Sequence, residues 1–574
     1  MNRRDLVQLL GLTVLAAAIP EPEAHAASAF GTAAFNQVGY LPHAQKVANV
    51  AAQDAADTSF QILTERGGSA VFHGSLGTPM LDAASGDRVA LADFSAWSRP
   101  GIYRLAAQGQ TSATFVIGAD VYRNPLRLTL RAFYGQRCGC VVDLGGGYAH
   151  PACHMTGAFH STSGRSGPLA NHGGWHDAGD YGRYIVNSGI STGTLLWAWE
   201  LYPRALRSLA LGIPESGGKT PDVLAEIRWN LEWMLSLHDD DGGVWHKQTS
   251  EQFYAFILPQ KDTLTSYVIG TGAEPYKSTC ATADLASVAA IAARCFGPYD
   301  SPFAARCLAA ARRAFAWAVA HPDVTFRNPP GIGTGAYGDS HCGDEILWAA
   351  AELWRTTGDA QYEQAFLSGA ASLPPETNLR TPQWSSVAPM AYWTYALADR
   401  TGSPELRARI RQQTVAAAED LIARRSGSSY GNTLALADYG WGSNGVAASQ
   451  SLLLLIAHHL QPDQRFAEAA LGNLHYLLGR NCFGVSWVTQ VGSNPFQHPH
   501  HRPSAADGIA APWPGLLSGG PNQRPADKVA VTLPRQPPMR MWIDDQGAYS
   551  MNEVAINWNA PLVFLLAAAN ELSA

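Results

Sequence analysis

Two carboxylates stand three residues apart in a glycine-rich stretch, as Asp177 and Asp180 of His172-Gly-Gly-Trp-His-Asp-Ala-Gly-Asp-Tyr. The stretch precedes a predicted helix, and the free N–H groups of a helix N-terminus favour ionised carboxylates. An ionised carboxylate can hold a water molecule and take its proton. The pair therefore indicates a general base for hydrolysis, with simple N-capping of the helix as the alternative.

A third carboxylate, Glu553, lies near the end of the chain between Tyr549 and Trp558, just before a strongly apolar predicted helix. Aromatic and apolar neighbours raise the pKa of a carboxyl group because they disfavour its charged form. A carboxyl group that stays protonated near neutral pH can act as a general acid. The alternative is a surface glutamate in the first turn of a helix, where the helix dipole favours it.

Three histidines and an arginine gather in a proline-rich segment, at His498, His500, His501 and Arg502. Such side chains are suited to polar contacts with a ligand. A metal site is the competing interpretation, but the histidines lack the spacing of residues on one helix face.

The elements that must position these groups change character near residue 120. Residues 30–118 contain short apolar runs separated by turn signals, which predicts a small all-β sandwich of immunoglobulin-like type. Residues 119–574 show helical periodicity and long loops instead. Helices paired around a ring, with the loops forming a cleft at one end, would explain this pattern. A solenoid is the alternative, but no repeat of fixed period is visible.

The periodicity predicts about twelve helices after the sandwich. They cover residues 121–138, 181–200, 221–238, 281–296, 303–320, 343–357, 359–369, 387–400, 404–425, 445–460, 463–478 and 551–571.

Length, composition and charge bound the class of protein. The 574 residues exceed one ordinary core, so we expect several domains or one very large domain. Hydrophobic residues make up 46% of the chain, which excludes global disorder. The net charge of −7 is spread without long runs, and no basic patch indicates a nucleic-acid partner. An uncharged partner is favoured.

Residues 1–26 are predicted to be a signal peptide, with Arg3 and Arg4, an apolar stretch and the cleavage site Ala24-His-Ala. The arginine pair resembles a twin-arginine (Tat) signal, and a Sec signal is the alternative. No other apolar run reaches the roughly 18 residues of a membrane span, and the best rival covers residues 446–460. We therefore expect a secreted or periplasmic protein without membrane contact.

The segments around Asp180, His500 and Glu553 together resemble glycoside hydrolase family 9, the inverting cellulases. The first family signature fits Ser486, Val488, Thr489, Gly492, Asn494, Pro499, His500 and Arg502. The second fits Trp542, Asp544, Tyr549, Glu553, Ala555, Asn559 and Ala560. Residues 35–40 are similar to the opening of the immunoglobulin-like module of one branch. The resemblance implies an all-α catalytic domain, an (α/α)6 barrel, behind the sandwich.

The resemblance also implies a role for each carboxylate. Asp180 would be the general base that activates water, and Asp177 would help to hold that water. Glu553 would be the general acid that protonates the leaving oxygen. Asp544 would orient neighbouring groups. Inversion requires room for a water molecule between acid and base.

Sugar contacts are implied at His500 and Arg502, beside the scissile bond. Sugars stack on flat rings, so Trp441, Tyr549 and Trp558 are predicted to line the cleft; Trp558 stands where many relatives have tyrosine. Further platform candidates are Trp245, Trp384 and Trp513, of which we expect Trp245 to lie in the core.

Eight cysteines in a chain of this length do not indicate a disulfide scaffold. Three of them lie close together in the sequence, near the predicted base. The five others are predicted to be buried free thiols: Cys280, Cys295, Cys307, Cys342 and Cys482.

A zinc site is predicted beside the catalytic stretch. Two thiolates and two imidazoles form a closed tetrahedral site, which is structural rather than catalytic. The family branch with the immunoglobulin-like module often has such a site, and free thiols are the alternative. The predicted ligands are Cys138, Cys153, His154 and His176, with Cys140 and His172 in reserve.

A calcium site is a second expectation. The stretch from Asp339 to Glu345 resembles a family segment that supplies oxygen ligands to calcium, a cation that prefers such hard donors. Asp344 and Glu345 are the predicted ligands. The alternative is that these two carboxylates simply begin a helix.

The leading functional hypothesis is an endo-β-1,4-glucanase that hydrolyses cellulose, related β-glucans or cello-oligosaccharides with inversion. An exo-acting member of the family (a cellobiohydrolase, β-glucosidase or glucosaminidase) is the first alternative. A non-catalytic glycan-binding protein is disfavoured by the intact carboxylates. A zinc hydrolase is disfavoured because four protein ligands leave no open position on the metal. We expect a monomer.

Overall fold

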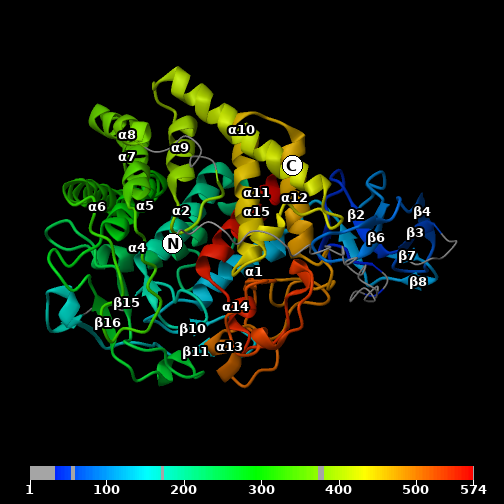
Figure 1. Cartoon of the computed structure of the whole chain (residues 1–574), viewed down its shortest axis with the longest axis horizontal. Helices are drawn as coiled ribbons and strands as arrows, with labels where there is room; N and C mark the ends of the chain where they lie inside the picture. Colours follow the sequence, from blue (N-terminus) through cyan, green and yellow to red (C-terminus); the bar gives the residue numbers. More distant parts are fainter. Residues whose placement is uncertain (1–30, 32, 53–57, 170–172, 373–379, 573–574) are drawn as a thin grey trace, which may run out of the picture.

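The computed structural model describes residues 31, 33–52, 58–169, 173–372 and 380–572. A β-sandwich lies beside one flank of a larger helical domain, as Figure 1 shows with the blue strands at the right. The predicted signal peptide, residues 1–26, lies outside the described residues.

Two sheets form the N-terminal sandwich, which confirms the predicted all-β domain. The larger sheet has the strand order β1-β9-β7-β3-β4 with β8 beside β7, and the smaller has the order β2-β6-β5. In β7, Tyr103, Leu105 and Ala107 are buried at the two-residue spacing of a strand, and they enter the core between the sheets. The strands are β1 (Gly39–Tyr40), β2 (Val47–Ala51), β3 (Ser59–Thr64), β4 (Ala70–Ser75), β5 (Met80–Leu81), β6 (Arg88–Asp93), β7 (Gly101–Ala107), β8 (Gln110–Thr111) and β9 (Phe115–Ile117).

Two concentric rings of helices form the second domain within the described residues, which confirms the predicted (α/α)6 barrel. Helices α2, α5, α7, α9, α11 and α15 pack side by side in the inner ring. Helices α1, α4, α6, α8, α10 and α12 pack against them from outside. Inner helices such as α2 and α15 are buried on nearly all sides, which explains why they are apolar around their whole circumference.

The helix bounds agree with the sequence pattern to within about three residues, except at two starts. The predicted helices 181–200 and 551–571 begin later, at Ile185 and Ile556, because the residues before them are extended or belong to a separate short helix. The barrel helices are α1 (Arg123–Gly135), α2 (Ile185–Leu201), α4 (Asp222–Ser236), α5 (Thr279–Phe296), α6 (Ser301–Ala320), α7 (Gly343–Thr357), α8 (Ala360–Ser372), α9 (Ala388–Leu397), α10 (Pro404–Ser426), α11 (Ser443–Leu460), α12 (Gln464–Leu477) and α15 (Ile556–Leu572). Connecting segments contain α3 (Pro203–Leu206), α13 (Arg502–Ala506) and α14 (Tyr549–Asn552).

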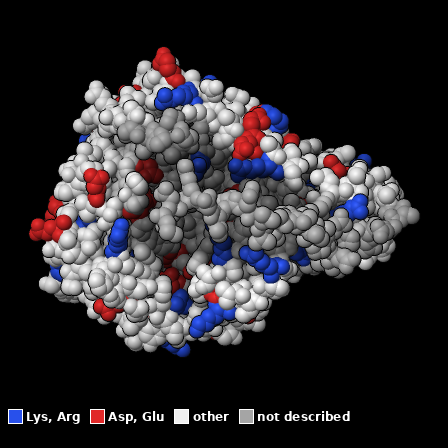
Figure 2. Space-filling model, viewed as in Figure 1, with Lys and Arg blue, Asp and Glu red and all other residues white. Residues whose placement is uncertain are grey.

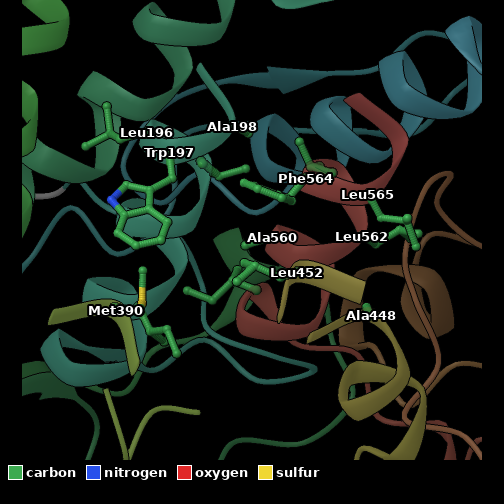
Figure 3. Close-up of a cluster of buried hydrophobic side chains, with 14 of the residues drawn as sticks. Leu196, Trp197, Ala198, Met390, Ala448, Leu452, Ala560, Leu562, Phe564 and Leu565 are labelled. Carbon is green, nitrogen blue, oxygen red and sulfur yellow. The ribbon is translucent and has the colours of Figure 1, made fainter. Parts of the chain in front are cut away.

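Apolar side chains from the inner helices fill the barrel. Figure 3 shows Trp197 of α2 facing Met390 of α9, with Leu452 of α11 and Ala560 of α15 beside them. The small residue Ala560 lets α15 approach α11 closely. This packed core fixes the ends of the inner helices, from which the active-site loops emerge.

One inner helix corrects the membrane analysis. Helix α5 is long and apolar enough to cross a membrane by length and composition, with a mean hydropathy of 1.3 over 18 residues. The sequence pattern predicts no such run after residue 26, and this prediction is wrong for α5. Of that window, 89% is buried inside the barrel, so the apolar composition is that of a core helix.

The cysteine prediction was wrong for one pair. Cys280, at the start of α5, forms a disulfide with Cys342, just before α7. The bond joins the end of the loop 321–342 to the inner ring. Cys295, Cys307 and Cys482 are buried free thiols, as predicted.

Short strands support the loops at the end of the barrel where the cavity lies. The order β13-β12-β16-β15-β14 forms one small sheet, and β10 pairs with β11. Strand β14 follows the Asp177–Asp180 segment directly, so the sheet supports the predicted base. The strands are β10 (Val142–Asp143), β11 (Ala149–His150), β12 (Gly157–Phe159), β13 (Pro168–Leu169), β14 (Arg183–Tyr184), β15 (Lys247–Thr249) and β16 (Ser266–Ile269).

Polar contacts join the sandwich to the barrel. Gln37 donates from its side-chain nitrogen to the Gly484 carbonyl at 2.7 Å and accepts the Asn494 N–H at 2.7 Å. Asp87 forms a buried ion pair with Arg540. The sandwich thus contacts both ends of the long segment that leads through His500 towards Glu553.

Candidate active site

All three predicted catalytic carboxylates line one cavity. The cavity has a volume of about 1380 Å³ and lies at the loop end of the barrel. Figure 2 shows this face of the molecule hollowed near its centre, with acidic and basic side chains around the hollow. Predicted residues on its wall are Asp177, Asp180, Glu553, His500, Arg502, Trp441, Tyr549 and Trp558.

Asp177 is held from two directions by side chains far away in the sequence. Its carboxylate accepts hydrogen bonds from the Asn187 amide at 2.6 Å and the Tyr337 hydroxyl at 2.6 Å. Burial raises the pKa of Asp177 to about 7, the charge of Asp180 adds to the rise, and these hydrogen bonds oppose it. Sequence reasoning missed Asn187 and Tyr337 because neither belongs to a recognised motif.

The helix-dipole argument for Asp177 and Asp180 was wrong. Both residues precede β14, and the N-cap position of α2 is Tyr184, without a side-chain cap. Asp180 instead accepts the Gly182 N–H at 2.9 Å, within its own turn. The N-capping alternative is excluded by the same geometry, and the turn presents both carboxylates to the cavity.

Gly179 allows the base segment to touch the His500 loop. A Cβ atom at this position would lie 1.8 Å from the His500 carbonyl oxygen, so no other residue fits without a shift of backbone. The main-chain N–H of Arg502 donates to the Gly179 carbonyl at 3.1 Å. The Ile556 N–H donates to the Asp177 carbonyl at 2.9 Å. Main-chain contacts therefore fix the base segment relative to the acid segment.

Glu553 has the environment that a general acid requires. Burial raises the pKa of Glu553 to about 8, the charges of Asp180 and Asp177 raise it further, and the Trp441 indole partly offsets them. Its main-chain oxygen accepts the Gly519 N–H at 2.8 Å. The side chain is therefore protonated at neutral pH and its backbone is fixed.

His500 and Arg502 lie on the cavity wall in different settings. The His500 Nδ1 is 2.8 Å from the Gln546 carbonyl, which makes Nδ1 the protonated nitrogen and leaves Nε2 as acceptor. Burial lowers the pKa of His500. The Arg502 guanidinium donates to the Gly179 and Tyr254 carbonyls, so it braces the wall as well as lining it.

Asp544 lies outside the cavity lining and joins two loops instead. Its carboxylate accepts the N–H groups of Gln497 and His498, each at 2.8 Å. These residues precede His500 in the chain. The two hydrogen bonds hold this peptide, and the orienting role that the family resemblance implies for Asp544 stays a prediction.

The aromatic candidates divide between cavity and core. Trp441 is 48% exposed, lines the cavity and lies 5.6 Å from the Tyr549 ring between centroids. Trp558 packs on Gly442 and Gly445, where a Cβ would come within 2.7 Å and 2.3 Å of its indole. Trp384 also lines the cavity, and Trp245 is buried as expected.

The platform hypothesis for Trp513 was wrong. This side chain is 1% exposed, and its indole N–H donates to Asp507 at 2.9 Å. It stacks near His150 with ring centroids 6.0 Å apart. Its place in the sequence, in a proline-rich loop, did not reveal that the loop folds back on α1 and the strands beside it.

The four predicted zinc ligands come together. Their donor atoms all lie within 4.8 Å of one another, with Cys138 Sγ 3.7 Å from His154 Nδ1 and Cys153 Sγ 3.8 Å from His176 Nε2. Tetrahedral zinc would separate such donor atoms by roughly 3.4–3.8 Å. His154 Nε2 contacts Asp262 at 3.3 Å, a carboxylate that sequence reasoning missed.

The reserve ligands are not part of this group. Cys140 is half-buried and lies outside it, and His172 lies outside the described residues. His176 directly precedes Asp177. The Cys/His group therefore anchors the peptide that carries the predicted base.

Two buried carboxylates, Asp284 and Glu345, lie close to the half-buried Asp339 and Asp344. Glu345 and Asp284 are 0% and 1% exposed, and their side-chain oxygens have no hydrogen-bond partner among the described residues. Burial raises the pKa of both groups, and the charges of Asp344 and Asp339 raise it further. Asp284, on α5, was missed because it lies far from this segment in the sequence.

The charge of this cluster needs compensation. Asp344 accepts the Val387 N–H at 2.8 Å, but no ion pair to any of the four carboxylates occurs in the described part of the chain. The unpartnered oxygens of Asp284 and Glu345 are the hard donors that a divalent cation such as calcium prefers. Asp344 and Glu345 both lie in the first turn of α7, as the alternative of two carboxylates that begin a helix predicts. It does not explain why Glu345 and Asp284 are buried without partners.

Comparison with known proteins identifies the family. The model of Glycosyl hydrolase family 9 matches residues 122–566, and the model of the Cellulase N-terminal ig-like domain matches residues 32–112. The chain therefore belongs to glycosyl hydrolase family 9, and it is a glycoside hydrolase.

Similarity to individual relatives extends over both domains. Endoglucanase D of Acetivibrio thermocellus is 35% identical over 540 residues, which cover 93% of this chain and 82% of that protein. The crystal structure of a Zn-binding triple mutant of the family 9 endoglucanase J30 has a TM-score of 0.86 at 35% identity and covers 92% of this chain and 99% of that one. The structure of AaCel9A in complex with cellobiose-like isofagomine has a TM-score of 0.85 at 34% identity, and the match covers 94% of this chain and 100% of that one.

Proposed function

We propose that the enzyme is an endo-acting β-1,4-glucanase that hydrolyses cellulose, related β-glucans or cello-oligosaccharides with inversion. The observation that carries the proposal is the shared cavity, in which Asp180 and Glu553 lie together with the exposed ring of Trp441. An inverting hydrolase needs one carboxylate to activate water and one carboxylic acid to protonate the leaving oxygen. The endoglucanase relatives and the cellobiose-like ligand of AaCel9A support a β-glucan substrate.

In this mechanism two of the three carboxyl groups transfer protons, and the third helps to hold the water. Asp180 takes a proton from the attacking water, and Asp177, fixed by Asn187 and Tyr337, helps to hold that water. Glu553 is protonated at neutral pH because its pKa is about 8, and it gives its proton to the leaving oxygen. Asp180 ends the reaction protonated and Glu553 ends it ionised, and proton exchange with solvent restores both groups.

Sugar rings are held by the remaining wall residues. Trp441 and Trp558 offer flat apolar faces, and Tyr549 lies beside Trp441. His500 Nε2 accepts a hydrogen bond from a sugar hydroxyl, because Nδ1 is engaged with Gln546. Asp544 keeps the peptide before His500 in place.

A structural zinc ion is part of the proposal. Cys138, Cys153, His154 and His176 would hold it, and the donor distances and the Asp262 contact support this set. Four protein ligands leave no open position, so the ion would supply cross-linking rather than chemistry. The similar structure described as a Zn-binding triple mutant of the J30 endoglucanase supports zinc as the metal.

A bound calcium ion is proposed at the second cluster. Asp284, Asp339, Asp344 and Glu345 would supply its oxygen ligands, and the unpartnered oxygens of Asp284 and Glu345 support it. The ion would neutralise charge between α5 and the start of α7.

We also propose export of the enzyme through the N-terminal signal, in a folded state if the signal is of the twin-arginine type. A cluster with two thiols supports folding before export, because metal loading would protect them from oxidation. Replacement of Arg3 and Arg4 by lysine should then retain active enzyme inside the cell. Undiminished export would indicate the Sec route.

Product analysis tests endo action directly. The viscosity of carboxymethylcellulose should fall early, before many reducing ends appear, and cello-oligosaccharides should be cut internally. Release of cellobiose or glucose from chain ends, with little loss of viscosity, would indicate an exo-acting enzyme instead. A protein that binds these glucans without cleaving them would contradict the proposal.

A further inference from the structure

The loop 321–342 brings a strained residue to the catalytic carboxylates. Tyr337 has a φ angle of +45°, in the left-handed region that side chains rarely adopt. Its hydroxyl donates to Asp177 at 2.6 Å. A strained conformation persists only where its surroundings hold it, so neighbouring groups must fix the residues that lead into Tyr337.

The buried side chain of Lys247 fixes the residues that lead into Tyr337. Its Nζ donates to the Asn328 side chain at 2.8 Å, to the Thr334 hydroxyl at 3.1 Å and to the Gly335 carbonyl at 2.7 Å. The Lys247 side chain is fully buried. The three N–H donors of this amine therefore all bind one loop. Two of them bind residues that shortly precede Tyr337, and the third binds Asn328.

The neighbourhood of Lys247 links it to the base as well. Lys247 in β15 pairs directly with Tyr184 in β14, shortly after Asp180 in the chain. Its Nζ lies 5.5 Å from the Tyr184 ring and 5.6 Å from the Phe326 ring. No carboxylate lies within ion-pair distance of it in the described part of the chain. Burial lowers the pKa of Lys247 to about 7, and the charge of Asp180 opposes this fall, so the amine is coupled electrostatically to the proposed base.

His246 extends the same support by one residue. Its Nε2 is 2.9 Å from the Ala336 carbonyl, and its ring stacks on Phe326 at 3.8 Å between centroids. The consecutive residues His246 and Lys247 thus hold the main chain at positions 335 and 336. The loop is anchored again at its end by the Cys280–Cys342 disulfide.

We propose that Lys247 is a positioning residue for hydrolysis, which holds the loop 328–336 so that the Tyr337 hydroxyl stays on Asp177. This inference rests on the proposed function, because it assigns Asp177 to the attacking water. Loss of Lys247 should relax the strain at Tyr337 and let the hydroxyl leave Asp177. The effect should fall on the chemical step and not on sugar binding, since Lys247 does not line the cavity.

A double-mutant cycle tests the proposal. On cellotetraose, Lys247→Met and Tyr337→Phe should each lower kcat roughly 10–100-fold and change KM less than about twofold. The double variant should be no slower than the slower single variant, because both changes remove one interaction. Lys247→Arg should restore part of the loss. Independent, multiplying losses would overturn the proposal, as would a folded Lys247→Met enzyme with normal kcat.

A matched control separates positioning from general stability. Lys277 is also buried, and it pairs with Asp239 and Asp241 away from the cavity. Lys277→Met should lower the melting temperature without lowering kcat. If Lys247→Met does not fold, Asn328→Ala and Thr334→Val remove two acceptors of the same amine and should lower kcat several-fold each, and unchanged kcat in both would overturn the proposal.

Amide hydrogen exchange keeps this test independent of the substrate. Exchange at residues 328–337 should be faster in Lys247→Met than in wild type and unchanged in Lys277→Met. If wild type does not cleave β-1,4-glucan but this exchange pattern appears, the proposed function fails while the role of Lys247 in the loop stands. Unchanged exchange together with unchanged kcat would overturn that role.

Discussion

The segment around Asp180 and the segment around Glu553 meet at one cavity, but different interactions hold them. On the base side, the Cys/His group lies next to Asp177, and the Cys280–Cys342 disulfide and buried Lys247 fix the loop that carries Tyr337. On the acid side, hydrogen bonds dominate. The Gly519 N–H binds the Glu553 carbonyl, and Asp544 binds the peptide before His500.

This difference corresponds to the two chemical tasks that we propose for these segments. The proposed base must keep a small, mobile water molecule in one place, and the hydrogen bonds from Asn187 and Tyr337 limit the movement of Asp177 beside it. The proposed acid must remain protonated, and burial together with the charges of Asp180 and Asp177 raises the pKa of Glu553 despite the opposing charge of Arg502. Substitutions near Glu553 should therefore change activity through its protonation state. Substitutions near Asp180 should act through the rigidity of that segment and the stability of the protein.

The largest effect is expected on the acid side. Glu553→Gln removes the proton donor and should lower kcat on carboxymethylcellulose by at least about 10³-fold. On an aryl cellobioside with a good leaving group the loss should be far smaller, because that group departs without a proton. Glu405→Gln, at the exposed start of α10, is the control. Equal losses on both substrates would argue against the acid role.

Removal of the proposed zinc should have the next largest effect. Cys153→Ser should lose about one zinc ion per chain, lower the melting temperature by several degrees and speed proteolysis near Asp177. Cys307→Ser, at a buried free thiol outside the group, should retain the metal. Metal analysis and calorimetry provide the measurement. A metal-free wild type with the same stability as loaded protein would exclude the site.

At the carboxylate cluster, the direction of the change in melting temperature distinguishes a calcium site from an empty cluster. Without a cation, Asp284→Asn should raise the melting temperature, because it removes one of several buried groups that repel each other. With calcium bound, the same change should lower it, because a ligand is lost. Thermal unfolding in calcium and in chelator compares the two states. A variant that is stabilised equally in both would argue against a calcium site.

The pH dependence should report Glu553. Since the acid must be protonated, kcat/KM should fall on the alkaline side with an apparent pKa of about 8. The folded-state pKa lies above the unfolded value, so the contribution of Glu553 to stability is present at acid pH and is lost as pH rises towards about 8. Glu553→Gln should therefore gain stability relative to wild type between pH 5 and about 8.5 in urea unfolding. A constant difference across that range would contradict the shift.

The smallest effect is expected at the aromatic wall. Trp441→Ala should raise KM for cello-oligosaccharides several-fold, with a smaller change of kcat, because a stacking surface is lost. Leu436→Ala is a matched control, since Leu436 is 50% exposed but does not line the cavity. A KM that is unaltered in both variants would place the bound sugar elsewhere.

Much of this architecture could be predicted from local patterns. The two-residue alternation in β7 and the helical periodicity of α7 or α12 depend on neighbours in the sequence, so they identified elements correctly. The catalytic motifs are equally local, because Asp177 and Asp180 share one turn and Glu553 has its aromatic neighbours close by. The donor set of the Cys/His group was also recognisable from residue types.

Contacts between distant segments could not be predicted in this way. Asn187 and Tyr337 bind Asp177, and Lys247 binds the loop that leads into Tyr337. Nothing in the sequence around these three residues marks them. The Cys280–Cys342 disulfide spans 62 residues, and only the packing of α5 against α7 brings its partners together. The helix-dipole argument for Asp177 failed because a short strand, β14, lies between that turn and α2.

Chemical rescue of Asp180→Ala tests the assignment of base and acid most directly. With the base removed, hydrolysis of carboxymethylcellulose should fall by orders of magnitude, and added azide should restore turnover and yield a glycosyl azide of inverted configuration. Azide should not restore Glu553→Ala on the same substrate, because the leaving oxygen still lacks its proton. Near-normal turnover of Asp180→Ala without azide, or rescue of Glu553→Ala in its place, would contradict the account.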